Sequence, residues 1–352
     1  MQSYYYLAFC FLEVPTGYIA DRFGCRRSMQ MGALALLVSH AFPIFLASYG
    51  GFLAHFLLLA VARSLVSGAA SAYLYESLQQ DGAVASYKQI EGNARAWGLI
   101  AKVVTWPTVG ALMAWHMNLP YWLTGVSALL ALFFASYLPD RRFNLQRAIS
   151  VSESVRALRS ILSTPALLLV MIMGVGIFVI GRIVQLNLFQ PILEANSFSV
   201  TSYGGIMAAM TVVEAVGSAR PMVLRRWMTD LSAVFVLTLF IAASMPFMAY
   251  GGQPGVVIGL ALFALTSGLA FPVQRQLLND VIVDPRFRAT VLSVESIVDR
   301  GVTSVAAWMA GIALASGRME HFLVGSAAMV VVVTGVVFAA LRNNKALLQP
   351  NH

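Results

Sequence analysis

The chain contains eleven apolar runs of about 20 residues, and these runs limit its fold more than any other feature. A helix of about 20 residues crosses a hydrocarbon core of ~30 Å. The strands of a membrane barrel are about ten residues long and alternate in polarity, which excludes a barrel here. We therefore predict an all-α integral membrane protein with spans near residues 2–20, 29–48, 52–75, 93–115, 118–138, 165–189, 200–219, 231–250, 255–274, 289–315 and 320–341.

The composition agrees with a surface that faces lipid. Of the 352 residues, 59% are hydrophobic and only 11% are charged, whereas a soluble chain carries roughly 25% charged residues. The net charge of +8 would suit a nucleic-acid partner, but eighteen Lys and Arg residues fall at alternate connections and only Arg318 at the opposite ones. This is the positive-inside pattern of a multi-pass protein of the cell membrane. It places the basic loops in the cytoplasm and excludes a nucleic-acid partner.

Patterns that would indicate an enzyme or a metal site are missing from the sequence. Cys10 and Cys25 form neither a disulfide framework nor a metal spacing, and the five histidines show no paired ligand pattern. The sequence also has no Gly-rich phosphate loop of the Walker type. We predict no cofactor, no metal, no catalytic residue and no enzymatic activity.

A hydrophilic stretch with five arginines divides the spans into two groups. We predict an N-terminal bundle of five spans at 1–138, a cytoplasmic linker at 139–164, a C-terminal bundle of six spans at 165–341 and a cytoplasmic tail at 342–352. Paired membrane halves are a common plan among secondary transporters.

The first basic loop carries the most specific motif. It reads Gly17-Tyr-Ile-Ala-Asp21-Arg22-Phe-Gly24-Cys-Arg26-Arg27, preceded by Glu13-Val-Pro15-Thr16. The loop resembles the signature of the major facilitator superfamily (MFS), and the preceding residues resemble a bacterial branch of it. The resemblance implies a two-bundle transporter of the bacterial inner membrane, with twelve helices in the full fold.

Each residue type in this loop has a physical use. Gly17 removes a side chain where two helices lie close together, and Gly24 permits the turn between two spans. The resemblance implies that Asp21, Arg22, Arg26 and Arg27 belong to a cytoplasmic gate, in which Asp21 with Arg22 and Arg26 latches the halves together. The alternative is an ordinary solvated loop with topogenic arginines.

The position of the motif leads us to expect one more helix before Met1. The signature follows the second helix of the family plan, yet here it follows the first span, and the first bundle has five spans instead of six. The alternative is a genuine eleven-helix variant.

Ionisable residues inside spans usually face a cavity or a partner, because they are costly in lipid. Glu214 ranks first as a proton carrier, because it lies among small residues well inside its span. Asp299, beside Arg300 and one turn from Glu295, is more typical of a structural ion-pair cluster. The bases Arg63, Lys102 and Arg182 could hold an anionic substrate or neutralise Glu214. The candidates for coupling or substrate binding are Glu214, Arg63, Lys102, Arg182, Asp299, Arg300 and Glu13.

These features predict a secondary active transporter that works by alternating access, with protons as the coupling ion. Aromatic residues and a partial likeness of Trp106-Pro107 and Gly110 to the antiporter signature favour efflux, by proton antiport, of a small amphipathic or drug-like molecule. The alternatives are an uptake symporter for a small nutrient or organic anion, and a transport-inactive truncated or sensor-like protein. The expected partners are a small-molecule substrate, protons and the lipid bilayer, with the protein as a monomer.

Overall fold

The computed structural model describes residues 1–83, 86–139, 164–219, 224, 227–282 and 288–343, and no β-strand occurs in these ranges. The chain divides into two compact units, 1–148 and 149–352. Their boundary falls inside the predicted linker, most of which lies outside the described residues. The predicted tail lies outside them as well, apart from its first two residues.

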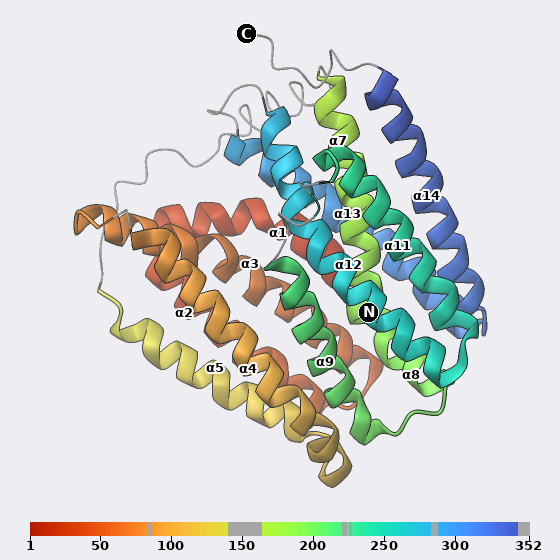
Figure 1. The fold of residues 1–352 in the computed structure, drawn as a ribbon. Coiled ribbons are helices and arrows are strands. Elements are labelled where there is room, and N and C mark those ends of the chain that lie inside the picture. Colours follow the sequence, from red (N-terminus) through yellow and green to blue (C-terminus); the bar gives the residue numbers. More distant parts are fainter. Residues whose placement is uncertain (84–85, 140–163, 220–223, 225–226, 283–287, 344–352) are drawn as a thin grey trace. The chain divides into compact units, whose positions relative to one another are not determined.

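The described part of unit 1 is a bundle of five helices in which α2 and α3 pack against each other and against the remaining three (Figure 1). Helix α2 packs against α1, α3 and α5, while α1 also packs against α3, and α4 contacts α3 and α5. The connections between α2 and α3 and between α4 and α5 are only three residues long. The helices are α1 (Gln2–Phe23), α2 (Cys25–Phe45), α3 (Tyr49–Gln80), α4 (Tyr87–Trp115) and α5 (Leu119–Tyr137).

Unit 2 is built around α7, which packs against α12, α13 and α14. Val170 and Met173 of α7 are completely buried there. The helix continues through a π-helical turn, η2, into α8, so that these three elements form one long segment (Figure 1). The elements are α7 (Pro165–Arg182), η2 (Ile183–Leu188), α8 (Phe189–Ala195), α9 (Val200–Ser218), α11 (Asp230–Tyr250), α12 (Gly252–Val281), α13 (Arg288–Ala315) and α14 (Met319–Asn343).

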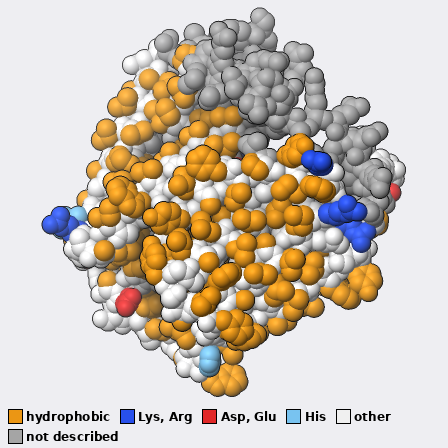
Figure 2. All heavy atoms as spheres, turned by 180° about the vertical axis from the view of Figure 1, so that it is seen from behind, with side chains coloured by type: hydrophobic (Ala, Val, Ile, Leu, Met, Phe, Trp, Pro, Cys, Tyr) orange, Lys and Arg blue, Asp and Glu red, His pale blue; other side chains and the backbone are white. Residues whose placement is uncertain are grey.

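Every predicted span coincides with a helical segment, which confirms the all-α membrane architecture. Nine helices of the described residues are long and apolar enough to cross a membrane. The other two, α1 with 22 residues and α4 with 29, also have the necessary length at ~1.5 Å per residue. Hydrophobic side chains dominate the face drawn in Figure 2, and charged ones are few. Phe134 and Val336 are each 66% exposed, which suits contact with lipid.

Small residues bring α9 and α12 together beside one of the predicted site residues. A Cβ on Gly268 of α12 would collide with the backbone of Glu214 in α9, and one on Gly217 would lie 2.6 Å from the Leu265 carbonyl oxygen. The Ser218 hydroxyl also donates to the Gly268 carbonyl at 3.0 Å. Close approach through small residues is typical of membrane helices, and here it fixes the position of Glu214.

The turn between α1 and α2 consists of Gly24 alone. Its backbone has φ +93° and ψ 146°, close to a region that essentially only glycine adopts. The Gly24 N–H donates to the Ala20 carbonyl at 2.9 Å, and its own carbonyl accepts from the Ser28 N–H at 3.1 Å. One residue therefore ends one helix and begins the next.

We expect Gly24→Ala to lower the free energy of unfolding by about 1–3 kcal/mol, because alanine is strained in this conformation. Thermal unfolding of the purified protein in detergent measures the effect. Gly205→Ala is the matched control, because Gly205 is helical and a Cβ there meets no atom within 4 Å. Equal unfolding temperatures for the two variants would contradict the strain at Gly24.

Candidate functional site

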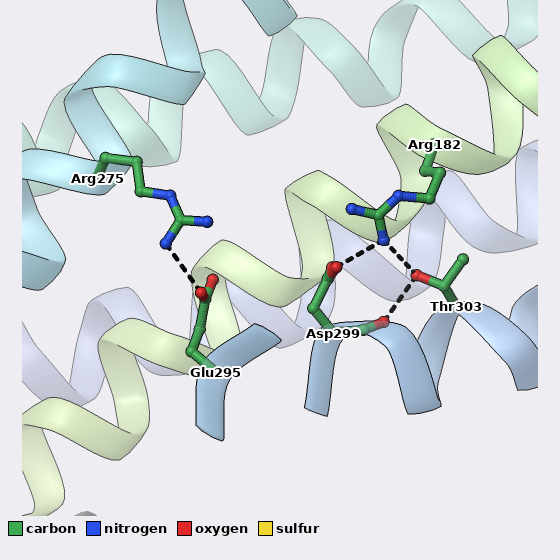
Figure 3. Close-up of polar contacts among 5 residues, drawn as sticks. All are labelled: Arg182, Arg275, Glu295, Asp299 and Thr303. Carbon is green, nitrogen blue, oxygen red and sulfur yellow. Dashed lines mark hydrogen bonds and ion pairs between the residues drawn. The ribbon is translucent and has the colours of Figure 1, made fainter. Parts of the chain in front are cut away.

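Three polar side chains form a stripe along α13 in unit 2. Glu295, Asp299 and Thr303 follow one another at intervals of four residues, which places them on one face of a helix. All three are buried, with exposed fractions of 1%, 5% and 0%. Figure 3 shows them directed toward two arginines, Arg182 from α7 and Arg275 from α12. We refer to these five residues as the charge ladder.

The first step of the charge ladder joins Arg182 to Asp299. The Arg182 Nη1 lies 2.6 Å from the Asp299 Oδ2 and also donates to the Thr303 hydroxyl at 2.9 Å. Thr303 in turn donates to the Asp299 backbone carbonyl at 2.7 Å. The other carboxylate oxygen of Asp299, Oδ1, is buried and accepts no hydrogen bond from the described residues. A buried carboxylate oxygen without a hydrogen bond is costly.

The second step joins Arg275 to Glu295 at 2.9 Å. The Glu295 side chain is 2% exposed, whereas that of Arg275 is 35% exposed. The Arg275 guanidinium also lies 5.4 Å from the ring centroid of Phe178 and 5.6 Å from that of Phe271. These distances are within the range of cation–π attraction. Arg275 is therefore held by one carboxylate and two aromatic rings.

Glu214 lies in a separate contact on α9. Its Oε2 accepts a hydrogen bond of 2.9 Å from the Gln185 amide of η2. Residues three apart share one side of an α-helix, yet Arg182 reaches α13 while Gln185 reaches α9. From Ile183 the chain forms a π-helix, a feature that is frequent at functional sites and has more residues per turn than an α-helix. The side chains of Arg182 and Gln185 therefore point in different directions.

Each unit holds part of the sequence-predicted charges. In unit 1, Arg63 of α3 and Lys102 of α4 are exposed, and Glu13 of α1 is half-buried. Lys102 lies 6.0 Å from the ring centroid of Trp106. In unit 2, the ion-pair partner of Asp299 at 2.6 Å is Arg182, which the sequence does not assign to it.

Half-buried Arg300 follows Asp299 on α13. Because both belong to one helix, their neighbourhood can be read from the sequence. The pairing of Asp299 with α7 depends on tertiary packing.

The loop motif is only partly in the predicted arrangement. Arg26 donates to the Ser136 carbonyl in the last turn of α5, where a cation suits the free carbonyls of a helix end. Arg22 and Arg27 are exposed. A Cβ on Gly17 meets no atom within 4 Å, so the close approach predicted at Gly17 is not seen among the described residues. The side chain of Asp21 lies outside the described part of the structure.

Sequence reasoning did not connect Arg275, Gln185 and Thr303 with the charged residues that they contact. Arg275 is one of the eighteen basic residues that the positive-inside pattern assigns to cytoplasmic connections. The four-residue spacing of Glu295, Asp299 and Thr303 is visible in the sequence and could have revealed one polar face of α13. Nothing in the sequence reveals which arginine faces which carboxylate.

With this geometry established, comparisons with known proteins assign the family. Residues 1–307 match the family model described as Major Facilitator Superfamily. The chain belongs to the major facilitator superfamily. Among curated proteins, no relative matches the sequence. As a member of this superfamily the protein is a multi-pass membrane transporter and not an enzyme.

Solved structures of other transporters share this MFS fold. A nucleoside transporter aligns with a TM-score of 0.76 at 16% identity, covering 96% of this chain and 89% of that one. A peptide transporter aligns with a TM-score of 0.70 at 12% identity, covering 98% and 86%. A D-xylose–proton symporter aligns with a TM-score of 0.70 at 13% identity, covering 96% and 88%. At these identities the likeness establishes the fold alone.

Proposed function

We propose that this MFS protein is a secondary active transporter driven by protons, which works by alternating access. The observation that carries the proposal is the charge ladder, in which two buried carboxylates each pair with an arginine whose side chain is less buried. Ionisable residues inside the membrane are costly and mark ion or substrate pathways. A carboxylate beside an arginine can exchange a proton when the arginine finds another anion.

The geometry favours Asp299 over Glu214 as the proton carrier. The Asp299 Oδ1 is buried without a hydrogen bond from the described residues, so one oxygen of this carboxylate is left to receive a proton or another donor. Glu214 is only half-buried, and its Oε2 accepts a hydrogen bond from the Gln185 amide. Glu214 remains the comparison residue in every test of coupling.

Export of a small amphipathic or drug-like molecule is the direction that the sequence favours. A growth-inhibition panel, in a host that lacks its efflux pumps, tests it. Expression of the protein should reduce inhibition by at least one compound, and dissipation of the pH gradient should restore it. Protection that survives dissipation of the pH gradient would contradict proton-coupled export.

Uptake of a small organic anion by proton symport is the second candidate. The observation that favours it is the exposure of the two arginine side chains, 20% for Arg182 and 35% for Arg275. Reconstituted vesicles should then accumulate a labelled organic acid under an inward proton gradient. If the vesicles do not accumulate the organic acid and the protein protects cells in the inhibition panel, the results favour export.

We propose that Asp21, with Arg22 and Arg26, acts in a cytoplasmic gate. The hydrogen bond from Arg26 to the Ser136 carbonyl connects this loop to the end of α5, the last helix of unit 1 among the described residues. A gate of this kind controls the exchange between conformations. The proposal also places the protein in a bacterial inner membrane as a monomer. A helix before Met1 stays a prediction.

We expect Asp21→Asn to reduce the transport rate about tenfold, while the amount of inserted protein stays unchanged, because one charge in the gate biases the conformational equilibrium. Initial rates of transport in vesicles with matched protein content measure the effect. Asp81→Asn, an exposed substitution at the end of α3, is the control. A normal rate in Asp21→Asn would remove Asp21 from the gate.

A further inference from the structure

We propose that His40 and His55 in unit 1 form a binding site for a transition-metal ion of the zinc type, which connects α2 to α3. Neither residue belongs to the charge ladder or to the proposed cytoplasmic gate, so the inference is independent of proton-coupled transport. The two histidines lie on different helices. No spacing in the sequence therefore indicates them as a pair.

The two imidazole rings are in direct contact. Their centroids lie 4.9 Å apart at an interplanar angle of 84°. The ring of Tyr121, in the first turn of α5, lies 5.7 Å from that of His55 and 6.2 Å from that of His40. His40 lies less than two turns before the end of α2, and His55 less than two turns after the start of α3. The pair is therefore close to the helix ends opposite Gly24, from which an ion has a short path.

The hydrogen bonds of the two rings fix which nitrogen carries the hydrogen. The His40 Nδ1 lies 2.8 Å from the Leu36 carbonyl oxygen, and the His55 Nδ1 lies 2.8 Å from the Ser39 carbonyl oxygen. A carbonyl oxygen can only accept, so each Nδ1 donates and each Nε2 keeps its lone pair when the ring is neutral. Histidines that ligate metals have this arrangement, in which the second ring nitrogen donates to a backbone carbonyl or a carboxylate.

Burial of both rings is the second support. His40 is 9% exposed and His55 is 6% exposed. Within the described part of the chain, both histidines form their hydrogen bonds through Nδ1 alone. A buried polar atom without a partner is costly, and an ionisable side chain inside a spanning helix indicates a functional site. A metal ion bound by both Nε2 atoms would satisfy two buried acceptors at once.

The distance between the rings suits one shared ion. Two Zn–N bonds of about 2.0–2.1 Å, added to the radii of the two rings, exceed the centroid separation of 4.9 Å, so one ion can reach both rings in a bent geometry. No group of three or more His, Cys, Asp or Glu residues occurs among the described residues. Water would therefore fill the other positions of a four-coordinate zinc ion. Imidazole favours zinc over magnesium, which prefers oxygen ligands.

The positive charge of Arg63 on α3 acts on His40 and opposes a cation there. This repulsion limits the affinity of the site for zinc. Arg63→Gln should therefore strengthen zinc binding.

Zinc binding to the purified full chain in detergent, without a histidine tag, tests the site. Titration calorimetry at neutral pH should show about one saturable Zn²⁺ site per chain and no binding of Mg²⁺ at the same concentrations. His40→Gln and His55→Gln should each weaken zinc binding at least about tenfold, because loss of even an outer partner of a ligand costs roughly 10–100-fold. His116→Gln and His321→Gln, which remove exposed histidines, should leave the affinity unchanged.

His55→Cys distinguishes ligation from packing. Because a cysteine thiolate is also a zinc ligand, this variant should bind zinc, whereas His55→Gln should not. Thermal unfolding without zinc shows that each variant is folded. Added Zn²⁺ should then raise the unfolding temperature of wild type and His55→Cys, but not that of His55→Gln. Absence of saturable zinc binding in wild type, or wild-type affinity in His40→Gln or His55→Gln, would overturn the inference. The tests of proton coupling would be unaffected, because the charge ladder lies in unit 2.

Discussion

Arg182→Gln is expected to lower the free energy of unfolding by about 3–5 kcal/mol, because it leaves a buried carboxylate without its partner. The Asp299 side chain is only 8% exposed, and Arg182 lies 2.6 Å from its Oδ2. Equilibrium unfolding in mixed micelles measures the loss. The double variant with Arg182→Gln and Asp299→Asn should recover most of it, because neither residue then carries a charge.

This double-mutant cycle isolates the pair from the general effect of removing an arginine. Arg318→Gln, at the turn before α14, provides the control for a charge outside the bundle. Equal destabilisation by Arg182→Gln and Arg318→Gln would mean that the pair does not stabilise unit 2. A double variant no more stable than Arg182→Gln would mean that Arg182 acts through other contacts.

Asp299→Asn is expected to abolish accumulation of substrate against a gradient while counterflow exchange continues, because exchange requires no net protonation. The same measurement on Glu214→Gln should give accumulation close to wild type. The Gln185 amide can donate to the new side-chain carbonyl as it donates to the Glu214 carboxylate at 2.9 Å. The two variants are matched, since each replaces one carboxylate by an amide of similar shape.

The opposite result in these accumulation measurements would identify Glu214, and not Asp299, as the proton carrier. Loss of accumulation in Glu214→Gln with normal accumulation in Asp299→Asn would show that the sequence ranks these carboxylates correctly. Loss of both accumulation and exchange in Asp299→Asn would assign Asp299 to substrate binding or folding. The unfolding measurements on the same variant separate those two roles.

The approximate positions of the helices could be predicted from hydropathy, whereas the residues at which the helices begin and end could not. Each apolar run became a helix because a spanning segment must satisfy its own backbone hydrogen bonds. Helix α3 nevertheless runs from Tyr49 to Gln80, beyond the predicted 52–75, because Ser48 caps its start by accepting from the Gly51 N–H. The π-helical turn at 183–188 has no counterpart in the apolar pattern.

The charge ladder could be predicted only along α13. The spacing of Glu295, Asp299 and Thr303 is local and therefore present in the sequence. The pairing of Asp299 with Arg182 joins residues 117 positions apart, and it depends on how α7 packs in unit 2. Arg275 lies within α12 and not in the connection after it, because hydropathy does not recognise an arginine that reaches a buried carboxylate.

Proton movement during transport tests the central claim most directly. The purified protein is reconstituted into vesicles that contain a pH-sensitive dye, and a concentration step of a substrate found in the inhibition or uptake assays is applied without an imposed pH gradient. The account predicts a change of internal pH that follows substrate flux in wild type and in Glu214→Gln and is absent in Asp299→Asn. Substrate flux in wild type without any change of internal pH would contradict it.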